Sequence, residues 1–264
     1  MPELPDLVVF KRYFEATSLH QKIVEVSIES QRVLENTPLP SLKRGLTGRE
    51  FETSRRYGKW LFAGLNNGEW LVLHFGMTGS LKYFQDLDDE PDYDQLLLSF
   101  ENGYHLAYLS QRKLGEIRMI EDPEAFIRSK DLGPDVLELD QDEFRSLLSG
   151  RRGMIKSALM DQELMAGIGN VYSDEVLYQL GIHPRTKTGN LSERDLTNLY
   201  QTLQDVLDTV IDRKAEPEQF PSDYLTPRRK PGAECPRCGE EIDRVKVAGR
   251  SAYYCPACQE LSGD

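Results

Sequence analysis

The sequence predicts an α+β protein of more than one domain, with a β-rich N-terminal half, a helical segment and a small C-terminal metal-binding module. Residues 22–120 contain short apolar runs joined by tight polar turns, which is typical of a β-sandwich or barrel. Residues 152–213 instead repeat apolar positions at helical spacing. All four cysteines follow residue 234, and this placement indicates a separate module.

Composition narrows the class of protein. The 264 residues are 39% hydrophobic and 29% charged, as expected for a globular protein with a sizeable core. No apolar run approaches the length of a membrane span, and no apolar signal segment opens the chain, so we expect a cytoplasmic protein without a membrane partner. The net charge of -12 argues against a protein that binds polyanions over its whole surface, although it leaves room for local basic patches.

The N-terminal half is expected to begin with a helix over residues 7–20, where Leu7, Phe10 and Phe14 recur near helical spacing. Strands are expected at residues 23–28, 60–63, 70–74, 96–100 and 105–109. Polar turns at 66–68 and 101–103 separate two pairs of these strands, which predicts hairpins. Two glycine-containing segments, 55–59 and 76–79, interrupt the strand pattern and would allow the backbone to approach another surface closely.

The second half predicts helices at residues 140–148, 155–160, 171–180 and 191–211. Gly167-Ile168-Gly169-Asn170 stands before the third of these helices, where backbone N–H groups and the helix N-terminus favour an anion. For this tetrapeptide taken alone, an ordinary helix–helix turn is the favoured interpretation. We expect domain boundaries at 1–130 for the β-rich domain, 131–150 for a linker, 151–230 for the helical domain and 231–264 for the metal module.

The cysteines form two C-x-x-C pairs, Cys235/Cys238 and Cys255/Cys258, separated by 16 residues. This spacing predicts a four-cysteine zinc site, and four thiolates leave no open position, so one structural zinc ion is expected. Short apolar runs at 244–247 and 251–254 predict a ribbon hairpin whose tip presents Arg250.

The first residues have their own chemistry. Removal of Met1 would give Pro2 a free secondary amine, and an α-amino group has a pKa of about 7.7–8.0. Such an amine can attack a carbonyl carbon to form a Schiff base, with Glu3 beside it to shuttle protons. A disordered N-terminal tail is the alternative interpretation of the same residues.

Several short motifs occur in one order along the chain. They lie at residues 1–5, 56–59, 74–79, 111–115, 155–156, 159–162, 167–172 and 181–184, and they end with the four cysteines and Arg250. In this order the whole chain resembles the Fpg/Nei family of DNA glycosylases. The resemblance implies an N-terminal β-sandwich, a helix–two-turn–helix domain and a C-terminal zinc ribbon.

The resemblance also implies an activity. The protein would be a monomeric bifunctional DNA glycosylase and AP lyase of base excision repair, acting on damaged double-stranded DNA. Pro2 would attack C1′ and release an oxidised base of the formamidopyrimidine or 8-oxoguanine type, and the Schiff base would then undergo β/δ-elimination.

The resemblance assigns roles to individual residues. The catalytic residues would be Pro2, Glu3, Lys59 and Arg250, with Glu3 as acid/base group and Lys59 as phosphate contact and proton donor. Arg250 and Asn170 would grip phosphates beside the lesion. The DNA-binding residues would be Met77, Arg112, Leu114 and Asn170, of which Met77, Arg112 and Leu114 would fill the gap left by the flipped base. Arg151 and Lys156 belong to a basic cluster at 151–156, and we expect them to bind DNA because of their charge.

Departures from the family pattern leave the substrate open. The formamidopyrimidine branch usually has Arg-Arg-Phe-Gly at 112–115, histidines near 93–95, and a longer loop before the first cysteine that closes over an oxidised guanine. Asp6 replaces a common glutamate, which predicts an altered start of the first helix. An endonuclease VIII-like enzyme for oxidised pyrimidines, a catalytically inactive DNA-damage-binding paralogue, and a zinc-ribbon adaptor for RNA or protein remain alternatives.

Overall fold

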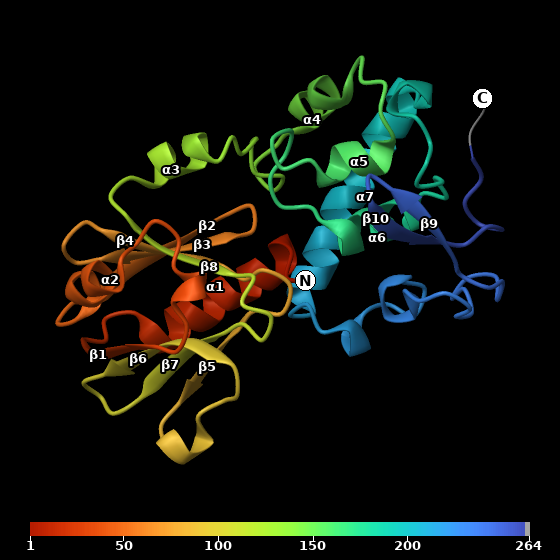
Figure 1. The fold of residues 1–264 in the computed structure, drawn as a ribbon. Coiled ribbons are helices and arrows are strands. Elements are labelled where there is room, and N and C mark those ends of the chain that lie inside the picture. Colours follow the sequence, from red (N-terminus) through yellow and green to blue (C-terminus); the bar gives the residue numbers. More distant parts are fainter. Residues whose placement is uncertain (262–264) are drawn as a thin grey trace. The chain divides into compact units, whose positions relative to one another are not determined.

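The computed structural model of the chain describes residues 1–261 (Figure 1). It forms two compact units, Met1–Asp131 and the chain from Leu132 onward. The first unit contains two antiparallel sheets, and the second contains helices followed by a two-stranded hairpin. The predicted α+β class, with a β-sandwich, a helical domain and a C-terminal ribbon, is confirmed. Within residues 1–261, no helix combines the length and hydrophobicity needed to cross a bilayer.

The sheets of the first unit each have four strands, in the orders β1-β6-β7-β5 and β2-β3-β4-β8. The predicted hairpins are confirmed as β3–β4 and β6–β7, while β2, β5 and β8 are additional. These three strands are hard to detect because polar residues and partly exposed positions interrupt their apolar pattern. The strands are β1 (Ile23–Ile28), β2 (Phe51–Tyr57), β3 (Trp60–Leu65), β4 (Trp70–His74), β5 (Ser80–Phe84), β6 (Asp94–Phe100), β7 (His105–Leu109) and β8 (Glu116–Ile120).

Helix α1 (Leu4–Ser18) lies between the two sheets (Figure 1) and contacts β2, β3 and β5. Its Phe14 ring meets Phe51 of β2 with 5.0 Å between centroids. On the other side, the hydroxyl of Tyr13 accepts a hydrogen bond from the Tyr83 amide of β5 at 2.7 Å. Because both sheets fasten this helix, the chain start is held against the core of the sandwich.

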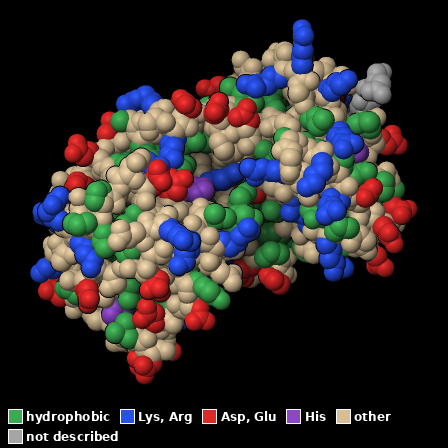
Figure 2. All heavy atoms as spheres, viewed as in Figure 1, with side chains coloured by type: hydrophobic (Ala, Val, Ile, Leu, Met, Phe, Trp, Pro, Cys, Tyr) green, Lys and Arg blue, Asp and Glu red, His purple; other side chains and the backbone are tan. Residues whose placement is uncertain are grey.

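Strand β3 is buried along its whole length, since both of its faces are covered. One face joins the sandwich core, and the other lies under α3 (Pro123–Ser129), whose Phe126 contacts Trp60 and Phe62 at centroid distances of 5.0 and 5.7 Å. The unit also contains α2 (Leu39–Leu46), η1 (Gln31–Val33) and η2 (Leu87–Asp89). Figure 2 shows acidic side chains over the tip around η2, which is an unfavourable surface for DNA phosphates.

The second unit is organised around α7 (Glu193–Asp212), which buries Leu199, Leu203 and Leu207 completely, as its apolar spacing predicts. Helices α4 (Gln141–Leu148) and α6 (Asn170–Gln179) pack against it, and α5 (Ile155–Met160) packs against α6. The segment 131–150 was expected as a linker, but from Leu132 onward it belongs to this packed unit. For example, the Gln204 side chain of α7 donates to the carbonyl of Val136 at 3.0 Å.

The C-terminal hairpin consists of β9 (Asp243–Val247) and β10 (Arg250–Tyr254), which pair antiparallel and pack against α6. Short 3-10 turns connect the rest of the unit: η3 (Thr188–Asn190), η4 (Pro217–Gln219) and η5 (Thr226–Arg228). Arg250 begins β10 opposite Val247 and is exposed, so the structure places it at the hairpin tip.

Candidate active site and nucleic-acid interface

The N-terminus of the chain is held by a capping box on α1. The Glu3 amide donates to the Asp6 carboxylate at 2.8 Å, and the Glu3 side chain accepts from the Asp6 amide. The reciprocal bonds satisfy two backbone donors at the helix start. Glu3 is fully buried, Pro2 is partly buried and Met1 is exposed. Asp6 thus starts the helix at Leu4, earlier than the predicted residue 7.

Burial raises the pKa of Asp6 to about 6, and the nearby Glu3 carboxylate contributes to the increase. The folded protein therefore disfavours the ionised form of Asp6. An unfolded aspartate loses its proton near pH 4. Between these two values the folded state holds more protons than the unfolded state, so stability falls as pH rises from about 4 to about 6.

Asp6→Asn should therefore gain stability over the wild type as pH rises through this window. The asparagine oxygen can still accept from the Glu3 amide, but it carries no charge. We expect the difference in the free energy of unfolding to grow between pH 4 and 6 by on the order of 2 kcal/mol, and then to level off. Urea denaturation at fixed pH values measures it, and a difference that does not change with pH would contradict the shifted pKa.

Lys59 lies in the turn between β2 and β3 and is partly exposed. Its positive charge affects the pKa of His74. Burial lowers this pKa to about 4; the Glu116 carboxylate opposes the decrease, and the Lys59 and Lys130 ammonium groups add to it. His74 is therefore neutral near pH 7. The neutral ring packs against the Trp60 ring, with 4.6 Å between centroids and a tilt of 41°. Its Nδ1 accepts from the Gly76 amide at 3.3 Å, which fixes the start of the loop after β4.

The three residues predicted to fill the gap of a flipped base lie together in the first unit. Met77 follows β4, whereas Arg112 and Leu114 precede β8, and an Arg112 Nη1 group lies 3.1 Å from the Met77 sulfur. Met77 is 43% exposed and Leu114 is 51% exposed, so solvent reaches both apolar side chains. Two apolar side chains and one cation projecting into solvent match what a wedge between DNA bases requires.

Close contacts hold the loop after β4 against the loop before β8. Gly76 adopts φ +57°, and a Cβ atom there would lie 2.6 Å from the backbone of Leu114. A Cβ atom at Gly115 would lie 1.7 Å from the hydroxyl of Tyr108, which itself donates to the carbonyl of His74 at 2.8 Å. Both glycines are thus required by the approach of one loop to the other.

Met77→Ala and Leu114→Ala should reduce activity on duplex DNA several-fold more than activity on single strands. Only the duplex leaves a gap when a nucleotide is flipped out, and an empty gap costs stacking energy of a few kcal/mol. Rates on paired substrates that differ only in the complementary strand measure the effect. Val24→Ala is the matched control because Val24 is 47% exposed on β1. Equal losses on both substrates would show a folding defect instead.

In the second unit, Asn170 opens α6 beside the ribbon hairpin. Its side-chain Nδ2 donates to the carbonyl of Ser251 at 3.1 Å, next in sequence to Arg250. This bond uses one of the two N–H groups of the carboxamide. Asn170 is therefore bonded to the residue that follows Arg250, at the N-terminus of a helix, where anions are favoured.

Lys156 was expected to contact DNA, and this prediction is wrong in its direct form. The side chain is fully buried, and its ammonium lies 2.7 Å from the Asp174 carboxylate, also fully buried. It further donates to the Ser173 hydroxyl at 2.7 Å and the Asn170 carbonyl at 3.1 Å. A cation enclosed in this way cannot reach a phosphate, so Lys156 can influence DNA only through Asn170.

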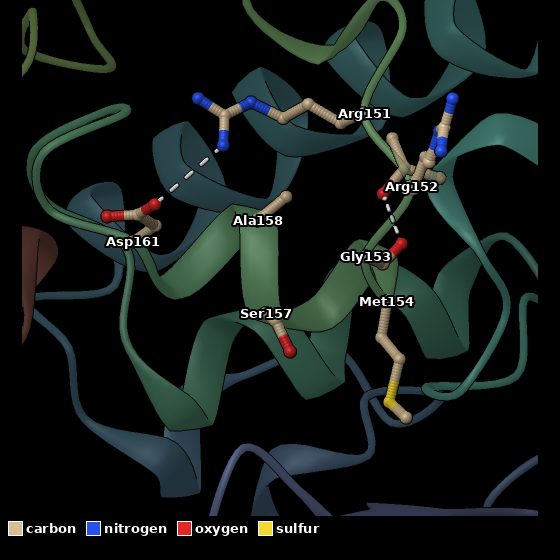
Figure 3. Close-up of a pocket in the computed structure, with 8 residues that line it drawn as sticks. Arg151, Arg152, Gly153, Met154, Ser157, Ala158 and Asp161 are labelled. Carbon is tan, nitrogen blue, oxygen red and sulfur yellow. Dashed lines mark hydrogen bonds and ion pairs between the residues drawn. The ribbon is translucent and has the colours of Figure 1, made fainter.

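Arg151 lies at the rim of a hollow of about 210 Å³ at the start of α5, together with Arg152, Met154 and Ser157 (Figure 3). Its side chain extends across the hollow toward Asp161, with 4.0 Å between the charged groups, and Nε donates to the Leu147 carbonyl at 3.0 Å. The side chain is 45% exposed. Arg151 is therefore accessible, but an acidic partner competes with any phosphate.

The four cysteine sulfurs lie within 4.8 Å of one another. Cys235–Cys258 and Cys238–Cys255 are separated by 3.8 and 3.5 Å. Thiolates at zinc–sulfur distances of about 2.3 Å in a tetrahedron are about 3.8 Å apart, so the residues fit one zinc ion with all four positions filled. The ion is structural, and it supplies no coordination site for a substrate.

Helix α6 and the turn after it support this zinc site. The Tyr178 hydroxyl lies 3.1 Å from the Cys235 sulfur, and Arg237 stacks over the Tyr178 ring at 4.5 Å while donating to the Tyr178 carbonyl. The Gln259 side chain connects the second knuckle to the Ile182 carbonyl at 2.9 Å. Outer contacts of this kind orient metal ligands, so the ribbon and α6 form one body.

Comparison with known proteins accounts for nearly the whole chain. Residues 1–117 match the formamidopyrimidine-DNA glycosylase N-terminal domain, residues 132–222 the H2TH domain of the same enzymes, and residues 232–261 the zinc finger found in FPG and IleRS. Formamidopyrimidine-DNA glycosylases from Pelotomaculum thermopropionicum and Lactococcus lactis subsp. cremoris are 30% and 32% identical. The matches cover 99% and 98% of this chain and 100% of each relative.

Solved structures agree. A Lactococcus lactis FPG mutant bound to Fapy-dG-containing DNA has a TM-score of 0.88 at 30% identity, and MutM bound to carbocyclic 8-oxo-G-containing DNA has one of 0.87 at 30% identity. Both cover 98% of this chain and 100% of theirs. Fold and relatives define a DNA-binding glycosylase of base excision repair, in the glycosylase/AP lyase enzyme class. The chain belongs to the Fpg/Nei family.

Proposed function

We propose that this enzyme uses the amine of Pro2, freed by removal of Met1, as its nucleophile. The main support is that Glu3 is fully buried and forms a capping box with Asp6. The backbone next to Pro2 is therefore held in place. Pro2 attacks C1′ of the flipped nucleotide, the base departs with the proton that the amine gives up, and the C1′–O4′ bond then breaks to give an iminium. Loss of a C2′ proton expels the 3′ phosphate, and a second elimination expels the 5′ phosphate. Glu3 delivers a proton to the O4′ oxygen as the sugar ring opens, and Lys59 contacts a phosphate of the DNA backbone.

The proposed DNA contacts are Met77, Arg112 and Leu114 as the wedge, and Asn170 and Arg250 on phosphates beside the lesion. Support comes from the shared exposed position of the wedge residues and from the hydrogen bond that joins Asn170 to the hairpin. Arg151 is a further phosphate contact if DNA displaces Asp161. The enzyme acts as a monomer. A reducing compartment such as the cytoplasm suits its four zinc thiolates.

The proposed substrates are oxidised bases of the formamidopyrimidine and 8-oxoguanine type, as in the relatives bound to such DNA. Oxidised pyrimidines are the second candidate because of how residues 214–234 are held. The buried Glu175 carboxylate accepts from the amides of Leu225 and Thr226 at 3.2 and 2.7 Å and from the Thr226 hydroxyl at 2.6 Å. A segment fastened to α6 in this way has little length left to cover a base.

A panel of duplexes, each with one defined lesion, tests this assignment. We expect strand cleavage at formamidopyrimidine or 8-oxoguanine sites to exceed cleavage at oxidised pyrimidines by at least about tenfold in kcat/KM, because a site that hydrogen-bonds one flipped base leaves its polar groups unpaired with another. The reverse ratio would establish the pyrimidine preference. Binding to all lesions without base release would identify a catalytically inactive damage-binding protein.

A further inference from the structure

Beneath the first turn of α6 lies a buried ionic cluster, formed by Lys156, Asp174 and Arg229. The Asp174 carboxylate is fully buried between two cations, with Lys156 Nζ at 2.7 Å and an Arg229 Nη2 group at 2.7 Å. Arg229 also donates through Nε at 2.8 Å, so its guanidinium binds the carboxylate with two nitrogens. Buried charges are tolerated only when they are paired and hydrogen-bonded in this manner.

The cluster contacts both parts of the proposed phosphate clamp, Asn170 and the Arg250 hairpin. The Asn170 carbonyl accepts from Lys156 at 3.1 Å and from Arg229 at 3.0 Å. On the hairpin side, Asp174 accepts from the Tyr253 amide at 3.1 Å, and the Arg229 guanidinium stacks over the Tyr253 ring at 4.8 Å. Arg229 therefore touches the backbone of α6 and a side chain of β10 with the same guanidinium.

We propose that the Lys156–Asp174–Arg229 cluster is a positioning device that sets Asn170 and Arg250 in one fixed geometry for a phosphate of the lesion-containing strand. This proposal rests on the proposed role of Asn170 and Arg250 as phosphate contacts. Arg229 is its central member because its side chain contacts Asp174, Asn170 and Tyr253 together. Its planar fork allows these contacts together, which the single ammonium of a lysine cannot reproduce.

Arg229→Lys tests the device because it keeps the charge and removes the fork. Arg228→Lys is the matched control, since Arg228 is the exposed neighbour. Binding to a duplex with a tetrahydrofuran abasic-site analogue, followed by fluorescence anisotropy over a range of KCl concentrations, gives affinity and salt slope. We expect Arg229→Lys to weaken binding roughly tenfold, a coupling typical of one contact network. Its salt slope should fall by about one, as for Arg250→Ala. Arg228→Lys should change neither, and zinc content should stay at one ion per chain in all variants.

A mutant cycle separates the positioning role of the cluster from the proposed phosphate contacts of Asn170 and Arg250. In the Asn170→Ala/Arg250→Ala background, Arg229→Lys should cost less than about twofold, because the groups that it positions are gone. If Arg229→Lys keeps its full effect in that background, the positioning role is wrong although the clamp stands. If Asn170→Ala and Arg250→Ala themselves bind like the wild type, the phosphate clamp is wrong, and the positioning role fails with it.

Discussion

An N-terminal extension before Met1 is expected to abolish covalent trapping of the enzyme on damaged DNA by borohydride. The untagged protein, once Met1 is removed, presents the secondary amine of Pro2, and reduction converts its iminium with C1′ into a stable amine. An extension keeps Pro2 in an amide, which is not nucleophilic. We expect a loss of at least about 100-fold in adduct on denaturing gels, because no other group supplies the covalent step.

The same extension placed after Asp264 is the control, and it should trap as well as the untagged chain. Binding to a tetrahydrofuran duplex should be preserved in both tagged forms, which separates chemistry from affinity. Mass spectrometry of the adduct should place the sugar on Pro2 in a chain that lacks Met1. Attachment at Lys59, or undiminished trapping by the N-terminally extended form, would show that Pro2 is not the nucleophile.

Local sequence patterns were sufficient where the responsible contacts are local. The spacing of the four cysteines predicts the zinc site because each knuckle closes within four residues, and the apolar stripe of α7 predicts its buried face. The start of α1 was placed three residues late. The capping box between Glu3 and Asp6 is also local, but its carboxylates take the positions that serine or threonine and glutamate usually occupy.

Contacts between distant segments were not predictable. Ser173-Asp174-Glu175 is a polar triplet inside a helix, for which a solvent-facing position is the ordinary expectation. Asp174 and Glu175 are buried because η5 and β10, some 50 to 80 residues later, cover them. Lys156 was assigned to DNA because a basic side chain is ordinarily expected at the surface. Its carboxylate partner, Asp174, can be recognised only once α5 and α6 are packed together. Tyr108 and Arg229 carry no sequence signal that would single them out.

Removal of zinc should weaken DNA affinity by at least about 100-fold while leaving the first unit folded. The apparent binding free energy of structural zinc in small finger peptides is about 10–16 kcal/mol, which exceeds what a 30-residue hairpin can supply by itself. Without the ion the hairpin loses its closure, and Arg250 loses its place beside Asn170. A strong chelator, or Cys258→Ser, should therefore lower zinc content toward zero together with affinity for a tetrahydrofuran duplex.

The two tryptophans make this prediction selective, because Trp60 and Trp70 both lie in the first unit, on β3 and β4. Tryptophan fluorescence during urea denaturation therefore reports the β-sandwich without contribution from the ribbon. The midpoint of that transition should be unchanged by the chelator, while DNA affinity falls and returns when zinc is added back. A chelator-treated protein that keeps its affinity would contradict the structural role of zinc. A shifted midpoint of the tryptophan transition would show that zinc also stabilises the β-sandwich.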